Sequence, residues 1–162
     1  MRRGILMVAG LAAVGTLYAC SKNDKTALGP LTPMPETWVA QLAGTKERPT
    51  PVVTTATGTA TFVFQPGGTI DYTIDVSGLS ALPTGMHIHA PADTSAAAGV
   101  IVGFSGFAVT TSGRIAQGTI IGVSPTVSID SLKSLIRLGK VYANVHTTVN
   151  LGGEIRGQLV KQ

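Results

Sequence analysis

The feature that most constrains the fold is the alternation of side-chain character in "TATFVFQPGGTIDYTIDVSG", residues 59–78. Apolar residues recur at every second position before the "PGG" and again after it. A period of two places successive side chains on opposite faces of a strand. Two such runs around a Pro-Gly-Gly turn predict a β-hairpin with one buried face and one solvent-facing face.

Short β-rich runs continue along the rest of the chain. Each is bounded by Gly, Pro, Ser or Thr, and together they cover residues 86–89, 99–104, 114–121, 141–146 and 154–160. Many short strands separated by turn residues are typical of antiparallel sandwiches and barrels. We therefore predict an all-β fold, an antiparallel β-sandwich or barrel of about seven or eight strands.

One short helix is expected among these strands. In "SIDSLKSLIRLGK", residues 128–140, Leu132, Leu135 and Ile136 form a single apolar stripe at helical spacing. Ser128 or Asp130 suits the N-cap position before this stripe. A helix of this length is not stable alone, so we expect it to pack against the sheet.

The N-terminus reads as a targeting segment followed by a tether. An apolar stretch, residues 5–17, is too short to span a membrane comfortably and leads into "LYAC". That pattern resembles a bacterial lipoprotein signal, which implies cleavage before Cys20 and lipidation of this cysteine. The alternative is an ordinary secretory signal with a stray cysteine. We expect residues 1–19 to be the signal peptide, residues 20–36 a lipid-anchored flexible tether, and residues 37–162 one domain.

Composition agrees with export and lipidation. Cys20 is the only cysteine, so no internal disulfide can form, and a lipid on its sulfur removes a reactive thiol. The formal charge of +4 includes Arg2 and Arg3, so loss of residues 1–19 leaves about +2. No run of Lys or Arg remains, which argues against nucleic-acid binding. The expected partners are a membrane, through the lipid anchor, and an unknown extracytoplasmic ligand or protein, and the expected location is the bacterial cell envelope.

The three histidines are the strongest candidates for chemistry. His87 and His89 lie in "GMHIHAPAD", and His146 lies in "YANVHTT". Residues i and i+2 of a strand share a face, so His87 and His89 can converge on one ion together with His146 from another strand. Three imidazoles with an open position suit copper or zinc. The alternatives are histidines that only hydrogen-bond loop carbonyls and a site for a non-metal ligand.

Two ordered motifs carry a resemblance to a known family. "GMHIHAPAD" followed by "SLIRLGKVYANVHTTVNLGGEIRGQL" closely resembles the CHRD domain, which is named after chordin and is also found in bacterial exported proteins. The resemblance covers most of residues 37–162. It implies a domain type rather than an activity. The growth-factor antagonism of chordin is associated with separate cysteine-rich modules, which this chain lacks.

A looser resemblance links the histidines to the copper/zinc superoxide dismutases. Those β-sandwiches also present copper ligands from an HxH strand and a later histidine strand, as His87, His89 and His146 do here. This chain lacks the histidine-rich zinc loop, the fourth copper histidine and the paired cysteines of that family. The resemblance therefore implies a copper-like cluster without the full ligand set of a dismutase.

Three polar residues are placed to support the histidines. Glu154 and Arg156 are i and i+2 in "GGEIRGQL", and Asn144 shares a strand face with His146. Arg156 would orient an anion or a ligand carboxylate through its planar fork. Glu154 and Asn144 would orient a histidine from behind. The alternative for Glu154 and Arg156 is a structural ion pair on the final strand.

These patterns predict a lipid-anchored extracytoplasmic CHRD-domain binding module that holds copper or zinc through three histidines. One alternative is a metal-dependent redox enzyme with superoxide dismutase-like chemistry. A second is a structural or adhesion domain of the cell envelope without metal. No hydrolase elbow and no phosphate-binding loop occurs in the sequence, so enzymatic activity is not favoured.

Overall fold

The described part of the chain is a single curled antiparallel sheet with one helix. The computed structural model describes residues 34–162. The strands are β1 (Glu36–Ala43), β2 (Thr57–Phe64), β3 (Ile70–Ser77), β4 (Pro83–His89), β5 (Val100–Gly103), β6 (Gly113–Ile120), β7 (Tyr142–Thr147), β8 (Ile155–Gln158) and β9 (Val160–Lys161). A 3-10 turn, η1 (Gly44–Lys46), follows β1, and the helix is α1 (Ile129–Arg137). The predicted leader and most of the predicted tether lie outside the described residues.

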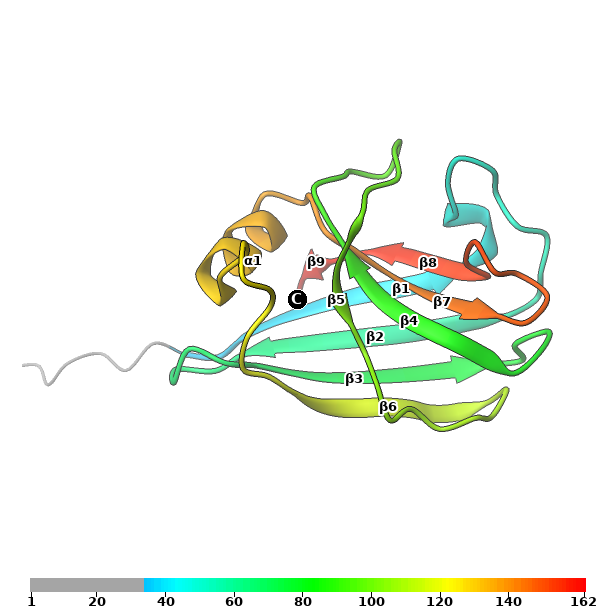
Figure 1. Ribbon diagram of the computed structural model, residues 1–162, viewed down its shortest axis with the longest axis horizontal. Coiled ribbons are helices and arrows are strands. Elements are labelled where there is room, and N and C mark those ends of the chain that lie inside the picture. Colours follow the sequence, from blue (N-terminus) through cyan, green and yellow to red (C-terminus); the bar gives the residue numbers. More distant parts are fainter. Residues whose placement is uncertain (1–33) are drawn as a thin grey trace, which may run out of the picture. The chain divides into compact units, whose positions relative to one another are not determined.

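The sheet order is β5-β4-β7-β8-β1-β2-β3-β6, with β9 paired to β1, and all of the pairings are antiparallel. The sheet curls into a half-barrel, so that β4 and the chain that contains β5 pass in front of β2 and β3 (Figure 1). The all-β prediction is confirmed. The sheet has nine strands, of which β9 contributes only two residues, against an expectation of about seven or eight.

The predicted hairpin is formed by β2 and β3. Phe62 pairs with Tyr72, and Phe64 pairs with Ile70 across the strands. Phe62 and Ile70 are fully buried, as the alternation of the sequence requires. The turn includes Gly68, whose φ of 93° lies in the left-handed region that glycine adopts without strain. This hairpin supplies a large part of the hydrophobic core.

The predicted helix is α1, and it packs on the sheet. Ser128 is the N-cap, and its side chain accepts a hydrogen bond from a backbone N–H of the first turn. Leu132 and Ile136 are fully buried, whereas Leu135 is half-buried. The Nζ atom of Lys133 donates to a carbonyl of the hairpin turn at 2.9 Å. No helix in residues 34–162 is long and apolar enough to cross a membrane.

Alternation along β4 separates the core from the outer face of the sheet. Met86 and Ile88 are fully buried in the hydrophobic core. The residues that alternate with them, His87 and His89, therefore point to the opposite face. The core fixes the direction of the two histidines, because a shift of β4 by one residue would place both of them in apolar surroundings.

Candidate metal centre

The pairing of β4 with β7 brings the three histidines to one place on the outer face. β7 carries outer-face side chains at alternate positions, as β4 does. Directly opposite residues in an antiparallel pair have neighbouring side chains. The opposed pairs are Gly85 with His146, His87 with Asn144, and His89 with Tyr142. The register therefore places a histidine, an asparagine and a tyrosine of β7 against the HxH motif.

The three imidazoles converge closely enough to share one ion. Each ring offers a nitrogen, and these three nitrogens lie within 4.8 Å of one another. Nδ1 of His87 is 2.9 Å from Nε2 of His146. His89 is 7% exposed, whereas His87 and His146 are half-exposed, so one side of the cluster is open to solvent. The predicted convergence of His87, His89 and His146 is present in the structure.

Backbone carbonyls determine which nitrogen of each ring faces the cluster. Nδ1 of His89 lies 2.9 Å from the carbonyl oxygen of Ala98, and Nδ1 of His146 lies 2.9 Å from that of Leu151. A carbonyl oxygen only accepts, so Nδ1 of each ring must carry the hydrogen. In the neutral ring the other nitrogen, Nε2, then carries a lone pair. Both lone pairs are directed toward the centre of the cluster.

The surroundings favour neutral rings in two of the three histidines. Burial lowers the pKa of His87 and of His89, because an imidazolium loses hydration there. The neighbouring ring of His146 lowers both pKa values further. The hydrogen bond to Ala98, and one to Asn144 that Nε2 can donate only when the ring is charged, act in the opposite direction but do not reverse the shift. Near neutral pH these nitrogens are available as ligands.

Asn144 adds an oxygen to the same point. Its Oδ1 atom is 3.0 Å from Nε2 of His89 and 3.1 Å from Nε2 of His146. With neutral rings, these contacts bring the lone pairs of two nitrogens and one oxygen together. Such atoms repel one another unless a proton or a cation lies between them. The convergence of these atoms is suited to a metal ion.

A stack of flat groups supports the cluster from the side of β8. The ring of His89 lies parallel to that of Tyr142, with an interplanar angle of 2° and centroids 4.7 Å apart. The guanidinium carbon of Arg156 lies 3.4 Å from the centre of the Tyr142 ring. β7 lies between β4 and β8, so Tyr142 is held between His89 and Arg156. Arg156 therefore supports His89 through Tyr142 and does not contact a histidine.

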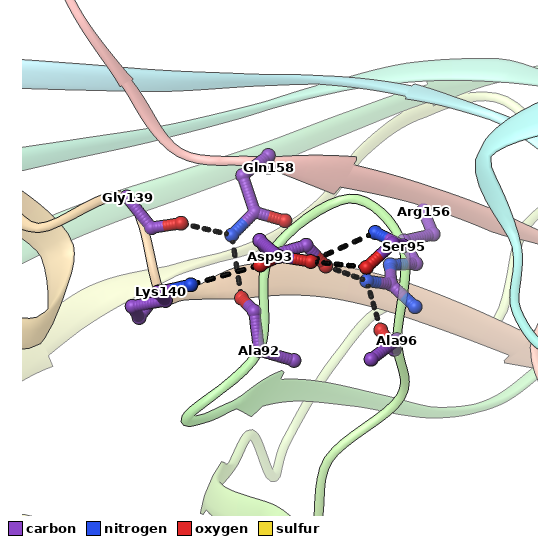
Figure 2. Close-up of polar contacts among 8 residues, drawn as sticks. All are labelled: Ala92, Asp93, Ser95, Ala96, Gly139, Lys140, Arg156 and Gln158. Carbon is purple, nitrogen blue, oxygen red and sulfur yellow. Dashed lines mark hydrogen bonds and ion pairs between the residues drawn. The ribbon is translucent and has the colours of Figure 1, made fainter.

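A loop, residues 90–99, covers this stack. Nη2 of Arg156 donates to the carbonyl oxygens of Asp93 and Ala96, at 3.0 and 2.7 Å (Figure 2). Nε2 of Gln158 donates to the carbonyl oxygen of Ala92 at 2.8 Å. Nζ of Lys140 binds the Asp93 carboxylate at 2.8 Å. These bonds hold the loop on the outer face, and the same loop supplies the carbonyl that fixes the tautomer of His89.

Glu47 lies behind Asn144 and was not singled out in the sequence. Its side chain is 3% exposed, and its Oε1 atom has no hydrogen-bond partner. Burial raises the pKa of Glu47 to about 7, although the positive charges of Arg156 and Arg48 act in the opposite direction. A Cβ atom on Gly153 would collide with this carboxylate and would lie 2.8 Å from Nδ2 of Asn144. Only glycine fits between the two side chains.

Glu154 lies apart from the histidines. Its carboxylate accepts hydrogen bonds from Thr54, Thr147 and both the backbone and the side chain of Ser80, at 2.8 to 2.9 Å. Burial opposes its charged form, but these hydrogen bonds lower the pKa of Glu154 overall. Among the described residues Glu154 forms no ion pair with Arg156 and no bond to a histidine. Cys20, the predicted lipidation site, lies outside the described residues.

The comparisons with known proteins place the chain in a family. A model of the CHRD domain matches residues 38–159. The chain belongs to the CHRD-domain family. Comparison with curated proteins and with solved structures gave no match. The resemblance to copper/zinc superoxide dismutases, drawn from the three histidines, stays a prediction for this CHRD domain.

The close approach at Gly153 predicts unequal effects of two neighbouring substitutions. Gly153 has a φ of 120°, and an added Cβ would push into Glu47 and Asn144, so Gly153→Ala should lower the free energy of unfolding by about 2 kcal/mol or more. A Cβ on Gly152 would meet nothing within 4 Å, so Gly152→Ala is the control. It should change the free energy of unfolding by less than about 0.5 kcal/mol. Chemical denaturation measures both. Equal effects would contradict the packing behind Asn144.

The raised pKa of Glu47 predicts a pH-dependent effect of Glu47→Gln. The pKa is about 7 in the folded protein against 4.5 for an unperturbed glutamate, so the folded state binds the proton more tightly. The stability contributed by this proton is present below pH ~4.5 and is lost as pH rises through ~7. The unfolding free energy of Glu47→Gln relative to wild type should therefore rise by about 3 kcal/mol between these limits. A difference that does not change with pH would contradict the neutral, buried carboxyl group.

Proposed function

We propose that this CHRD domain is a binding module that holds Cu(II) or Zn(II) through His87, His89 and His146. The observation that carries the proposal is the pair of Nδ1 hydrogen bonds to backbone carbonyl oxygens, which turn two Nε2 lone pairs toward one point. Metal-ligating histidines almost always donate their second ring nitrogen in this way. The rings are therefore oriented for ligation by the fold itself.

The spacing and the chemistry of the donor atoms fit these metals. The nitrogen and oxygen atoms at the cluster are 2.9, 3.0 and 3.1 Å apart. Four ligands at the usual bond length of a tetrahedral zinc site lie about 3.4 Å from one another. The closest pairs therefore need to open by a few tenths of an ångström, whereas the widest histidine pair, within 4.8 Å, needs to close toward that spacing. Imidazole nitrogen without a thiolate favours Cu(II) or Zn(II) over Cu(I).

A network without metal is the competing account of the same contacts. The bond between Nδ1 of His87 and Nε2 of His146, at 2.9 Å, satisfies both atoms without an ion. In that account Asn144 turns its amide nitrogen toward the rings and donates to them. Both accounts predict that the histidines stabilise the fold. Only the metal centre predicts that added metal stabilises it further.

Binding is favoured over superoxide-type redox catalysis. Within residues 34–162, no second group of three or more potential ligands lies close enough to hold a metal ion. A second metal beside the first is therefore not expected, in contrast to the dismutases that the HxH motif resembles. Superoxide turnover by the copper-loaded protein should be weak or absent.

We further propose that the protein is a lipoprotein of the bacterial cell envelope, facing the periplasm or the exterior. The charged and apolar leader that ends in "LYAC" supports this proposal, as does the use of the single cysteine at that position. Acyl chains contribute about 0.8 kcal/mol per buried CH₂, so a multiply acylated cysteine anchors stably. The anchor would keep the domain attached to the membrane through the tether.

Metal should stabilise the domain at neutral pH. At a free concentration of ~100 times Kd, Zn(II) or Cu(II) should raise the free energy of unfolding by about 2.7 kcal/mol. This gain should fade as pH falls, because protons compete for the ligand nitrogens; since burial lowers the pKa of His87 and of His89, the loss should begin below the unperturbed value of ~6.5. Replacing His87, His89 or His146 by alanine should remove most of the gain. Thermal unfolding with and without metal measures it.

Asp75→Asn is the matched control for the histidine variants. The substitution removes the exposed carboxylate of Asp75 on β3, which pairs with Arg114 and could itself bind a cation. It leaves the histidine cluster intact. Metal should raise the free energy of unfolding of Asp75→Asn by the same amount as that of the wild-type protein. Wild-type protein that purifies without metal and shows no shift with either ion would contradict the proposal. A shift that persists in all three histidine variants would contradict it equally.

Lipidation at Cys20 predicts a change of location in Cys20→Ser. The variant has no sulfur to acylate, so it should lose labelling with a fatty-acid analogue and move to the aqueous phase of a detergent partition. Ser21→Ala, one residue along, should keep the label. A Cys20→Ser protein that remains membrane-bound and is processed at the same site would show that the anchor lies elsewhere.

A further inference from the structure

A cavity of about 450 Å³ lies beside the histidine cluster, on the outer face of β1, β8 and β9. Drug-sized ligands commonly occupy cavities of this size. The lining residues include Val39, Gln41, Lys46, Arg48, Arg156 and Val160. No histidine lines the cavity, so it is distinct from the candidate metal centre.

Positive charge dominates the lining. Lys46, Arg48 and Arg156 all contribute, and no aspartate or glutamate is among the described residues that line the cavity. The nearest acidic group in sequence is Glu47, whose buried carboxyl group lies near Asn144 and interacts with the charge of Arg156. Even a fully charged Glu47 would offset only one of the three cationic side chains of the lining. The cavity is therefore suited to an anion.

Two lining residues keep hydrogen-bonding capacity that the protein does not use. Arg156 is 2% exposed; its Nη2 atom donates to two loop carbonyls, but its Nη1 atom has no partner. Gln158 donates through Nε2 to two carbonyls, and its Oε1 atom has no partner. Figure 2 shows both side chains held by the loop, with these atoms outside the dashed network. Buried polar atoms without partners are uncommon in proteins, and a functional role is one explanation of them.

The remaining wall is apolar. Val39 of β1 pairs directly with Val160 of β9, so the two side chains lie next to each other on the outer face. Val160 is 58% exposed. A bare inorganic anion would leave this apolar surface uncovered. An occupant with both a charged head and an apolar body would contact the whole lining.

We propose that this cavity is a second binding site, for a small organic anion with a carboxylate on an apolar body. The carboxylate meets the cationic end formed by Lys46, Arg48 and Arg156. The apolar body covers Val39 and Val160. The site requires no metal, so its occupancy can be measured in metal-free protein and does not depend on the proposed metal centre.

The test uses octanoate as the probe. Octanol, which has the apolar body without the charge, and inorganic phosphate, which has charge without the apolar body, are the comparison ligands. Titrated into metal-free protein, octanoate should bind with a Kd that rises with salt concentration, because salt screens its charge. Octanol and phosphate should each bind at least about tenfold more weakly. Backbone amide shifts in a nuclear magnetic resonance titration should centre on Val39 and Val160.

Variants at exposed positions separate the cavity from the general surface charge. Lys46→Gln combined with Arg48→Gln should weaken octanoate binding about tenfold. Val160→Trp, which fills the cavity, should abolish it. Arg114→Gln removes a cation from β6, outside the lining, and should leave Kd within about twofold of wild type.

Three results would overturn this proposal. Octanol that binds as tightly as octanoate would show an apolar crevice only. Phosphate that competes equally with octanoate would show an inorganic anion site. Binding that survives both Val160→Trp and the double variant would place the ligand elsewhere. None of these results bears on the metal centre, which the histidine variants test separately.

Discussion

The register of β4 against β7 is the constraint on which the outer face depends. It places His87 opposite Asn144 and His89 opposite Tyr142, and it brings His146 beside them. That register is set from the other side of the sheet, where Met86 and Ile88 are fully buried in the core. A slip of one residue would bury both histidines of the HxH motif and expose these two apolar side chains. Hydrophobic burial therefore positions the candidate metal centre before any ion is bound.

The outer face is unusual for an antiparallel sheet because much of it is covered. Such sheets commonly leave one face in water, but here the loop of residues 90–99 and the segment around Glu47 lie over β7 and β8. Arg156 holds the loop through backbone carbonyls and supports Tyr142 with its guanidinium plane. The cover gives the imidazoles fixed hydrogen-bond partners, which is what determines their tautomers. It also leaves a cationic cavity at its edge.

The sequence predicted the parts of this arrangement that follow from local periodicity. The β2–β3 hairpin, α1 with its cap at Ser128, and the shared face of His87 and His89 all follow from spacing alone. Contacts made by loops could not be predicted in that way, because no period relates Ala98 to His89 or Glu47 to Asn144. For Glu154 the i, i+2 pattern with Arg156 was misleading. The chain at Glu154 turns its carboxylate to Ser80 and Thr147 before the regular strand β8 begins.

Backbone carbonyls hold His89 and His146 with the proton on Nδ1, which leaves the two Nε2 lone pairs free. Long-range nitrogen–proton correlation spectra of the metal-free, isotope-labelled protein near neutral pH report the tautomer of each ring directly. We expect the Nδ1–H form for both histidines, and we expect added Zn(II) to shift the two Nε2 resonances while the Nδ1 protons remain. Nε2–H tautomers in the metal-free protein, unchanged by Zn(II), would contradict this expectation.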